Sequence, residues 1–274
     1  MSVMKNIAYE SRKDILVLGK RLGDNGVHLG GCFSIIDMLT VLYQKVIRLD
    51  KNNLTDETRD RVVMSKGHGS IAQYVAMYRA GIYDDLAMFD NLLGKDAIFY
   101  KQSVRNPEYG LEFSSGSLGQ GLAYGIGVAW SLKKKKNNIS HVYVFHGDGE
   151  CNEGSVWEAA SIASHLKLNN VTVIVDRNKL QIDGNTEEIN KMAQLEERWR
   201  SFGFDTIVID GHNYNKIEQA LRYRNSDKPI AIVANTIKGK GVSFAENNAE
   251  WHQNILTDYL YEQGIKELCL KGDR

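Results

Sequence analysis

Short apolar runs alternate with helical segments in the second half of the chain, and this pattern constrains the fold more than any other feature. Four runs rich in β-branched residues occupy about 142–145, 171–175, 206–209 and 230–234. The segments between them, at about 155–166, 195–202 and 217–223, have the apolar spacing of helices. Such alternation predicts βαβ units, and therefore an α/β fold with a doubly wound, mainly parallel sheet that carries helices on both faces.

The first half of the chain predicts helices joined by glycine-rich loops. Ser34 resembles a cap that opens an apolar helix reaching about residue 46, and residues 61–65 form a short strand candidate. A further helix, at about 119–132, carries Gly121, Gly125 and Ala129 four positions apart, which leaves a smooth face for the sheet or for another chain. Residues 238–254 predict a loop, followed by a last helix. We expect one domain over 1–274, with an N-terminal helical segment and no second full domain.

Charge and cysteine content exclude several classes of function. The 34 Lys and Arg residues balance 34 Asp and Glu residues, so no overall field attracts nucleic acid or an anionic membrane. The three cysteines, Cys32, Cys151 and Cys269, lie far apart without a C-x-x-C pair, so neither a disulfide framework nor a zinc site is expected. No stretch resembles a signal peptide or a membrane span, and we expect a cytoplasmic location.

Polar residues follow two successive strands of the predicted sheet. Gly147-Asp148-Gly149 ends the first strand, and Asn178 follows the second. Ligands in such sheets bind beyond the carboxyl ends of the strands, where these side chains would share a pocket if the strands are neighbours. Oxygen ligands of this kind suit Mg²⁺ when phosphate oxygens and water complete its coordination. These residues leave an alternative open, in which Asp148 is a turn residue and Asn178 is a loop residue without a ligand.

Histidines strengthen the interpretation as a ligand site. His28, His68 and His252 lie in loops rich in glycine or asparagine, where side chains are better placed for ligands than for packing. The other four histidines, His141, His146, His165 and His212, are expected to have structural roles.

Several motifs together resemble the transketolase family. GDGECNEG followed by NKLQIDG is similar to the thiamine diphosphate fingerprint in its transketolase form. SKGHGS at 65–70, SSGSLGQGLAYGIGVA at 114–129, DGHN at 210–213 and KGKGVSFAENNAEWH at 238–252 resemble the family in the same order. The match covers about residues 5 to 265. The resemblance implies the thiamine-diphosphate-binding fold, and it favours a cation-binding role for Asp148 over the turn.

Roles for individual residues are implied by the resemblance alone. Mg²⁺ (or Ca²⁺) would be held by Asp148, Asn178 and the carbonyl of Leu180, clamping the diphosphate of thiamine diphosphate. His68 and His252 would approach the diphosphate or thiazolium end, and His28 would face the donor sugar. Glu153 would join a carboxylate network across a subunit interface. The remaining cofactor contacts implied are Gly116, Leu118, Gly147, Gly149 and Ile182.

A partner chain is also implied. The family's activating glutamate belongs to a separate pyrimidine-binding domain, for which residues 1–274 have no counterpart. The resemblance therefore implies the N-terminal subunit of a split transketolase, an α₂β₂ assembly active only with its second subunit, which transfers a two-carbon ketol unit between sugars or sugar phosphates. Two alternatives are a regulatory remnant of the fold, and a 2-oxo acid dehydrogenase α subunit or deoxyxylulose-phosphate synthase.

Two positions depart from the family pattern. Asn106 stands where the family commonly has a histidine that touches the donor, and Ser117 stands where many members have proline. Asn106 is therefore a candidate catalytic residue that can form hydrogen bonds but does not titrate near neutrality. Both departures leave the identity of the donor and acceptor sugars open.

Overall fold

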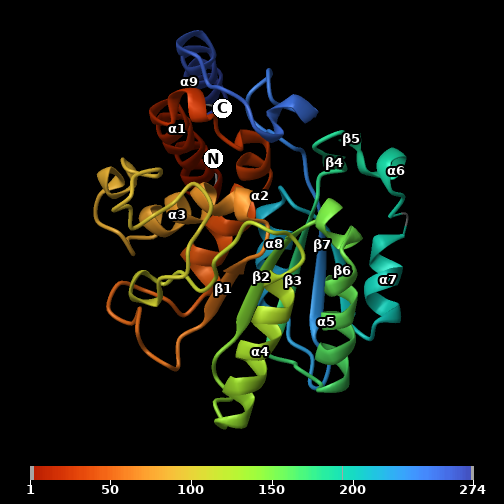
Figure 1. The fold of residues 1–274 in the computed structure, drawn as a ribbon. Helices are drawn as coiled ribbons and strands as arrows, with labels where there is room; N and C mark the ends of the chain where they lie inside the picture. The colour runs from red at the N-terminus through yellow and green to blue at the C-terminus, as the bar shows by residue number, and fades with distance from the viewer. Residues whose placement is uncertain (1–2, 193, 273–274) are drawn as a thin grey trace.

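A five-stranded parallel sheet forms the centre of the computed structural model, which describes residues 3–192 and 194–272 (Figure 1). The strand order is β1-β2-β3-β7-β6, and every neighbouring pair is parallel. A two-stranded antiparallel ribbon, β4-β5, lies after the end of β3. The strands are β1 (Arg61–Met64), β2 (Val142–Gly147), β3 (Val171–Arg177), β4 (Leu180–Gln181), β5 (Gly184–Asn185), β6 (Asp205–Asp210) and β7 (Ile230–Asn235).

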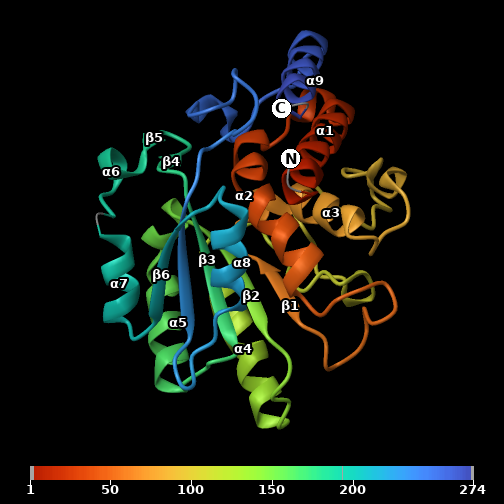
Figure 2. The ribbon, with the colours of Figure 1, turned by 180° about the vertical axis from the view of Figure 1, so that it is seen from behind.

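Helices cover both faces of this sheet, as the alternating pattern predicts (Figures 1 and 2). Helices α4, α5 and α7 pack on one face, while α2 and α8 pack on the other, with α1, α3 and α9 beyond α2. The helices are α1 (Val3–Arg21), α2 (Leu29–Val41), α3 (Ser70–Arg79), α4 (Gly121–Lys134), α5 (Gly154–His165), α6 (Thr186–Ile189), α7 (Leu195–Ser201), α8 (Tyr214–Arg222) and α9 (Asp258–Gly272).

Side-chain alternation along the strands divides the core into two layers. In β2, Tyr143 and Phe145 point into the cluster beneath α2 and α8, whereas Val142 and Val144 point into the cluster beneath α4 and α5. All four side chains are fully buried. A strand that is buried on both faces needs a continuous apolar run, which explains why the strands can be recognised in the sequence.

One sequence expectation about helices is wrong, and a second is decided between its two alternatives. Ser34 does not open a helix: α2 begins at Leu29, and the Ser34 hydroxyl lies inside it, donating to the buried carboxylate of Asp176 at 2.6 Å. The small residues Gly121, Gly125 and Ala129 are buried within the chain. A Cβ at Gly125 would come within 2.8 Å of Val144, so this row of α4 lies against the sheet and is not available to another chain.

Within the described chain, no helix is both long and apolar enough to span a membrane.

Candidate active site

Strand register brings the predicted ligand residues to one edge of the sheet. Gly147 pairs with Asp176 where β2 and β3 end. Asp148 and Asn178 follow these residues and line one cavity of about 380 Å³. The expectation that they share a pocket at the carboxyl edge is therefore confirmed. The cavity is lined by Gly31, Lys66, His68, Leu118, Gly147, Asp148, Gly149, Glu150, Asn152, Glu153, Asn178, Leu180, Gln181, Ile182, Asp183, Ile189, Asn190, Lys238 and His252.

Asp148 is held in place by backbone donors on both of its oxygens. Oδ1 accepts from the Gly149 amide at 2.8 Å, and Oδ2 accepts from the Lys179 amide at 2.6 Å. Burial and the nearby charge of Asp176 raise the pKa of Asp148 to about 6. A cation bound at this carboxylate would oppose both effects and favour its ionised form. Asp148 thus links the β2 turn to the loop after β3 and presents a carboxylate that benefits from a cation.

The loop after β3 supplies two further oxygens. Asn178 Oδ1 accepts from the Leu180 amide at 3.0 Å, and Asn178 Nδ2 donates to Asp176 at 2.9 Å. Lys179, between them, has a left-handed backbone with φ of 64°. The Leu180 carbonyl accepts from Lys238 Nζ at 3.0 Å. Side chains and backbone of this loop therefore contribute oxygen atoms to the same cavity.

Three histidines from distant parts of the sequence lie close together, and two of them, His68 and His252, line the cavity, whereas His28 does not. The ring centroids of His28, His68 and His252 are 5.0 to 5.9 Å apart. An antiparallel bridge between Val27 and Asn254 ties the first of these segments to the last. The three loop histidines therefore form one cluster, which the sequence did not predict.

Close packing around the histidines requires small residues at the start of α2. A Cβ at Gly31 would lie 2.5 Å from the His68 ring, and a Cβ at Gly30 would lie 2.7 Å from the Trp251 carbonyl oxygen. Glycine at both positions therefore allows the segments that carry His68 and His252 to approach α2.

All three histidines are held in the neutral form. Burial, with neighbouring lysines, lowers the pKa of His28 to about 4 and that of His252 to about 3, and the pKa of His68 lies well below its ordinary value. His28 Nδ1 is buried and has no hydrogen-bond partner among the described residues. Neutral imidazoles can both donate and accept hydrogen bonds, so the cluster is suited to bind hydroxyl groups and to move their protons.

Two buried lysines, which the sequence interpretation missed, face the same cavity. Lys66 is completely buried and pairs with Asp176 at 2.5 Å. Burial and Lys66 lower the pKa of Lys238 to about 8. Lys66 belongs to the motif SKGH and Lys238 to the motif KGKG, in which the histidine and the glycines are the more conspicuous residues. Cations facing a cavity are the signal that could have indicated an anionic ligand.

The residues present fit a divalent cation held together with a diphosphate. Asp148, Asn178 and Leu180 offer oxygen atoms, and Lys66 and Lys238 offer positive charge for phosphate oxygens. Across residues 3–192 and 194–272, no cluster of three His, Cys, Asp or Glu side chains could hold a metal by itself. A single carboxylate with neutral oxygens is the kind of set that Mg²⁺ accepts when phosphate completes its coordination.

Other predicted residues are distributed unevenly around the cavity. Leu118, Gly147, Gly149 and Ile182 line it, and Glu153 lines it as an exposed residue at the start of α5. Gly116 does not line it.

Asn106 also lies away from the cavity lining and exchanges backbone hydrogen bonds with Leu111. The assignments of individual roles, including Asn106 as a donor contact, stay predictions.

Glu150 is a residue that the sequence analysis overlooked in favour of Glu153. It is buried and accepts hydrogen bonds from the amides of Gly119 and Gly147, at 2.8 and 3.1 Å, and from the Ser65 hydroxyl. These contacts fix the GDG turn against the loop before α4. Glu150 therefore shapes the wall of the cavity.

A doubly wound sheet with a cation- and phosphate-compatible cavity at its carboxyl edge is the arrangement of a cofactor-binding α/β protein. The family model described as the transketolase thiamine diphosphate binding domain matches residues 15–269. The chain therefore belongs to the transketolase family. The predicted family, fold class and transketolase-type function are confirmed at that level.

Similar proteins include both separate subunits and longer transketolases. The chain is 37% identical to the 6-deoxy-6-sulfo-D-fructose transketolase subunit of Clostridium sp. (strain MSTE9), with 92% of each chain covered. It is 37% identical to an apulose-4-phosphate transketolase subunit of Phocaeicola vulgatus, over 88% of this chain and 85% of that one. It is 32% identical to human transketolase but covers only 38% of its length.

Solved structures of transketolases also match almost the whole of this chain with part of a longer protein. Transketolase from Leishmania mexicana matches with a TM-score of 0.87 and 28% identity, over 100% of this chain and 42% of that chain. Transketolase from Campylobacter jejuni matches with a TM-score of 0.88 and 28% identity, over 98% and 43%. The chain thus spans less than half the length of these transketolases.

Proposed function

We propose that this chain is the diphosphate-binding subunit of a two-chain transketolase, which moves a two-carbon ketol unit from a ketose to an aldose with thiamine diphosphate and Mg²⁺. The observation that carries the proposal is the cavity that Asp148, Asn178 and Leu180 line together with Lys66 and Lys238. The family match supports the cofactor. When bound, thiamine diphosphate would supply the electron sink for carbon–carbon bond cleavage.

The chain's own residues would then bind, orient and exchange protons. Asp148, Asn178 and the Leu180 carbonyl would hold Mg²⁺, while Lys66 and Lys238 would neutralise the diphosphate. The three neutral histidines would form hydrogen bonds with hydroxyl groups of the donor and move their protons. Residues 1–274 would form one diphosphate-binding domain. A cytoplasmic location is consistent with the three free cysteines.

A partner subunit would supply the pyrimidine-binding domain and its glutamate, in an α₂β₂ assembly. Two relatives that match this chain along most of their length are named as transketolase subunits, which supports a second chain.

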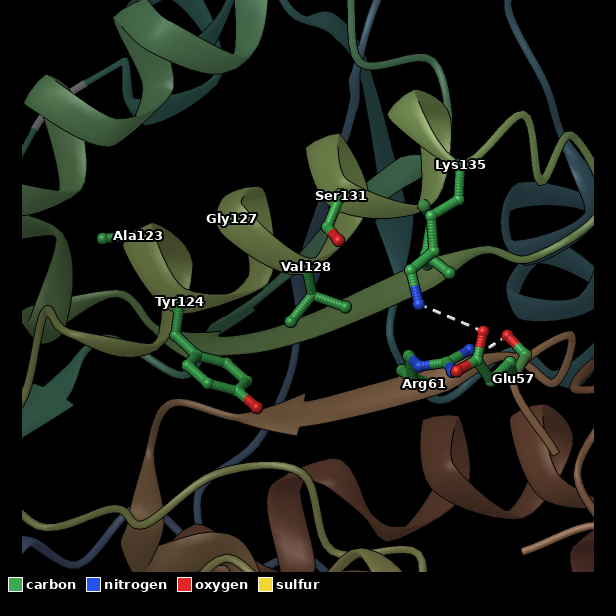
Figure 3. A pocket seen from close by; sticks show the side chains of 9 residues that line it. Glu57, Arg61, Ala123, Tyr124, Gly127, Val128, Ser131 and Lys135 are labelled. Atoms are coloured by element: carbon green, nitrogen blue, oxygen red, sulfur yellow. Dashed lines mark hydrogen bonds and ion pairs between the residues drawn. The ribbon is translucent and has the colours of Figure 1, made fainter. Parts of the chain in front are cut away.

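The outer side of α4 provides a surface for that partner. Ala123, Gly127 and Ser131 are exposed and, with Tyr124 and Val128, line an open groove of about 430 Å³ whose other end carries the charged residues Glu57, Arg61 and Lys135 (Figure 3). No charged residue occurs in this helix before Lys133. Helix α4 begins close to the cofactor cavity, because the preceding Leu118 lines that cavity. A partner lying along α4 would therefore reach the cofactor cavity.

Reconstitution of the two subunits tests this function. The purified chain alone should show no detectable ketol transfer, and addition of the partner should restore transfer that depends on thiamine diphosphate and Mg²⁺. Suitable donors are 6-deoxy-6-sulfo-D-fructose, apulose 4-phosphate and common ketose phosphates, with pyruvate as the control donor. Robust turnover by the isolated chain would refute the two-chain proposal, and activity restricted to pyruvate would refute ketol transfer.

A further inference from the structure

A buried carboxylate outside the proposed ligand set contacts two residues that line the cavity, Lys66 and Asn178. Asp176, in β3, is completely buried. Its Oδ2 accepts from Ser34 Oγ at 2.6 Å, from Lys66 Nζ at 2.5 Å and from Asn178 Nδ2 at 2.9 Å. Its Oδ1 accepts from the hydroxyl of Thr236. The donors come from α2, the loop after β1, the end of β3 and the segment after β7, so Asp176 joins four parts of the site.

The contacts of Asn178 with Asp176 and with the Leu180 amide together select which end of the Asn178 amide faces Asp176. The two ends of an amide are similar in shape but opposite in hydrogen bonding, since one donates and the other accepts. An ionised carboxylate only accepts, so the NH₂ group of Asn178 must face Asp176. Asn178 Oδ1 is then directed the other way, toward the Leu180 amide at 3.0 Å. In the opposite orientation Asn178 would present its NH₂ group to a cation, which would repel it.

We propose that Asp176 is a positioning residue for the cation site, which fixes Asn178 with its carbonyl oxygen toward the metal. The inference rests on the proposed function, because it requires that Asn178 contact a cation bound with thiamine diphosphate. Residues behind metal ligands commonly set the orientation of those ligands, and their loss weakens metal binding by about 10–100-fold.

Substitution Asp176→Asn tests the inference, with the chain assembled with its partner subunit. An amide at position 176 can donate as well as accept, so only the Leu180 amide would still favour the observed orientation of Asn178. Thiamine diphosphate binding is measured by calorimetry across a titration of MgCl₂, and again in EDTA. The Mg²⁺ concentration for half-maximal binding should rise at least about tenfold. Affinity in EDTA should stay within about twofold of wild type.

Thr236→Val is the matched control. It removes a donor from the same carboxylate but acts on Oδ1, and it leaves the three contacts of Oδ2 in place. Its Mg²⁺ requirement should stay within about twofold of wild type. If Asp176→Asn does not fold, Asp176→Glu keeps the charge beside Lys66 while moving the carboxylate by one methylene, and its Mg²⁺ requirement should also rise.

The outcomes separate this inference from the function on which it rests. A wild-type assembly without Mg²⁺-dependent binding would overturn both. Mg²⁺-dependent binding in the wild type, with an unchanged Mg²⁺ requirement in both Asp176 variants, would overturn the positioning role alone. Equal losses of affinity with and without Mg²⁺ would also overturn it, because they would indicate general damage to the cavity.

Discussion

Two buried carboxylates, Asp37 and Asp176, each form an ion pair with a buried cation, but the two pairs have different roles in this protein. Asp37 accepts from both Arg12 Nη atoms at 2.9 Å, and it also contacts His212 and Tyr214, at 2.7 and 2.8 Å. Asp176 has one lysine and three neutral donors. Each carboxylate is compensated by a buried cation, as burial of charge requires.

The difference between the two clusters lies in where their donors point. The groups around Asp37 come from α1, α8 and the turn before α8, and none of them lines the cofactor cavity. Lys66 and Asn178, around Asp176, line that cavity. The first cluster fastens helices to each other, whereas the second orients groups toward a ligand. In this protein, the buried ion pair whose neighbours line the cavity is the one that we assign to ligand binding.

The strongest contrast is expected from Asp148→Ala, which removes the only carboxylate of the proposed cation site. This substitution should abolish Mg²⁺-dependent binding of thiamine diphosphate in the assembled enzyme. The free energy of unfolding should change little, because the loss of two backbone hydrogen bonds to the carboxylate is offset by relief of the desolvation that raises the pKa of Asp148 to about 6. Calorimetry and urea unfolding measure the two quantities. Asp183→Ala is the control, since Asp183 is exposed at the cavity. Unchanged affinity in Asp148→Ala would restore the interpretation of Asp148 as a turn residue.

The opposite result, a loss of stability without a loss of cofactor binding, is expected when the cluster around Asp37 is disrupted. Arg12→Ala leaves the Asp37 carboxylate buried without its cation, which should lower the free energy of unfolding by about 3–5 kcal/mol. The folded protein should bind thiamine diphosphate and Mg²⁺ with an affinity within about twofold of wild type. Urea unfolding and calorimetry again provide the measurements. A variant with normal stability but weakened cofactor binding would reverse the roles assigned to the two clusters.

A smaller effect on the free energy of unfolding is expected from pH, because burial lowers the pKa of the histidines in the site. His28 has a pKa of about 4 in the folded chain and about 6.5 when unfolded. The unfolded state therefore binds more protons between these values, and the stability from neutral His28 is present above pH 6.5 and lost as pH falls through 4. The loss amounts to about 3 kcal/mol. In urea unfolding at several pH values, His28→Gln should reduce the dependence of the free energy of unfolding on pH between 4 and 6.5. An identical profile would show that His28 does not titrate as described.

The smallest effect on the cofactor site is expected at Asn106, outside the cavity lining. Asn106→His should change the ratio of kcat/KM values between donors, while thiamine diphosphate affinity stays within about twofold. It should not restore ketol transfer without the partner subunit. Steady-state kinetics with several ketose donors measure the ratio. Equal changes for every donor would count against contact between this position and the substrate.

Much of the fold could be predicted because its strands are buried on both faces. The predicted runs correspond to β2, β3, β6 and β7, which extend one or two residues beyond some of the predicted limits. The start of α2 was misplaced at Ser34, since a serine that caps a helix and one that reaches a buried carboxylate look alike in a sequence. The sequence also does not show which of Glu150 and Glu153 has the structural role, because the two differ in burial and burial depends on the tertiary structure.

By itself, the sequence determined the alternation of strands and helices, the GDG turn and the family, because these depend on residues that are close along the chain or on ordered motifs. The tertiary structure decided which row of α4 meets the sheet, the gathering of His28, His68 and His252, and the pKa of Asp148. It also placed Lys66 and Lys238 in the cavity. These properties depend on contacts and desolvation between segments far apart in sequence, and local spacing carries no information about either.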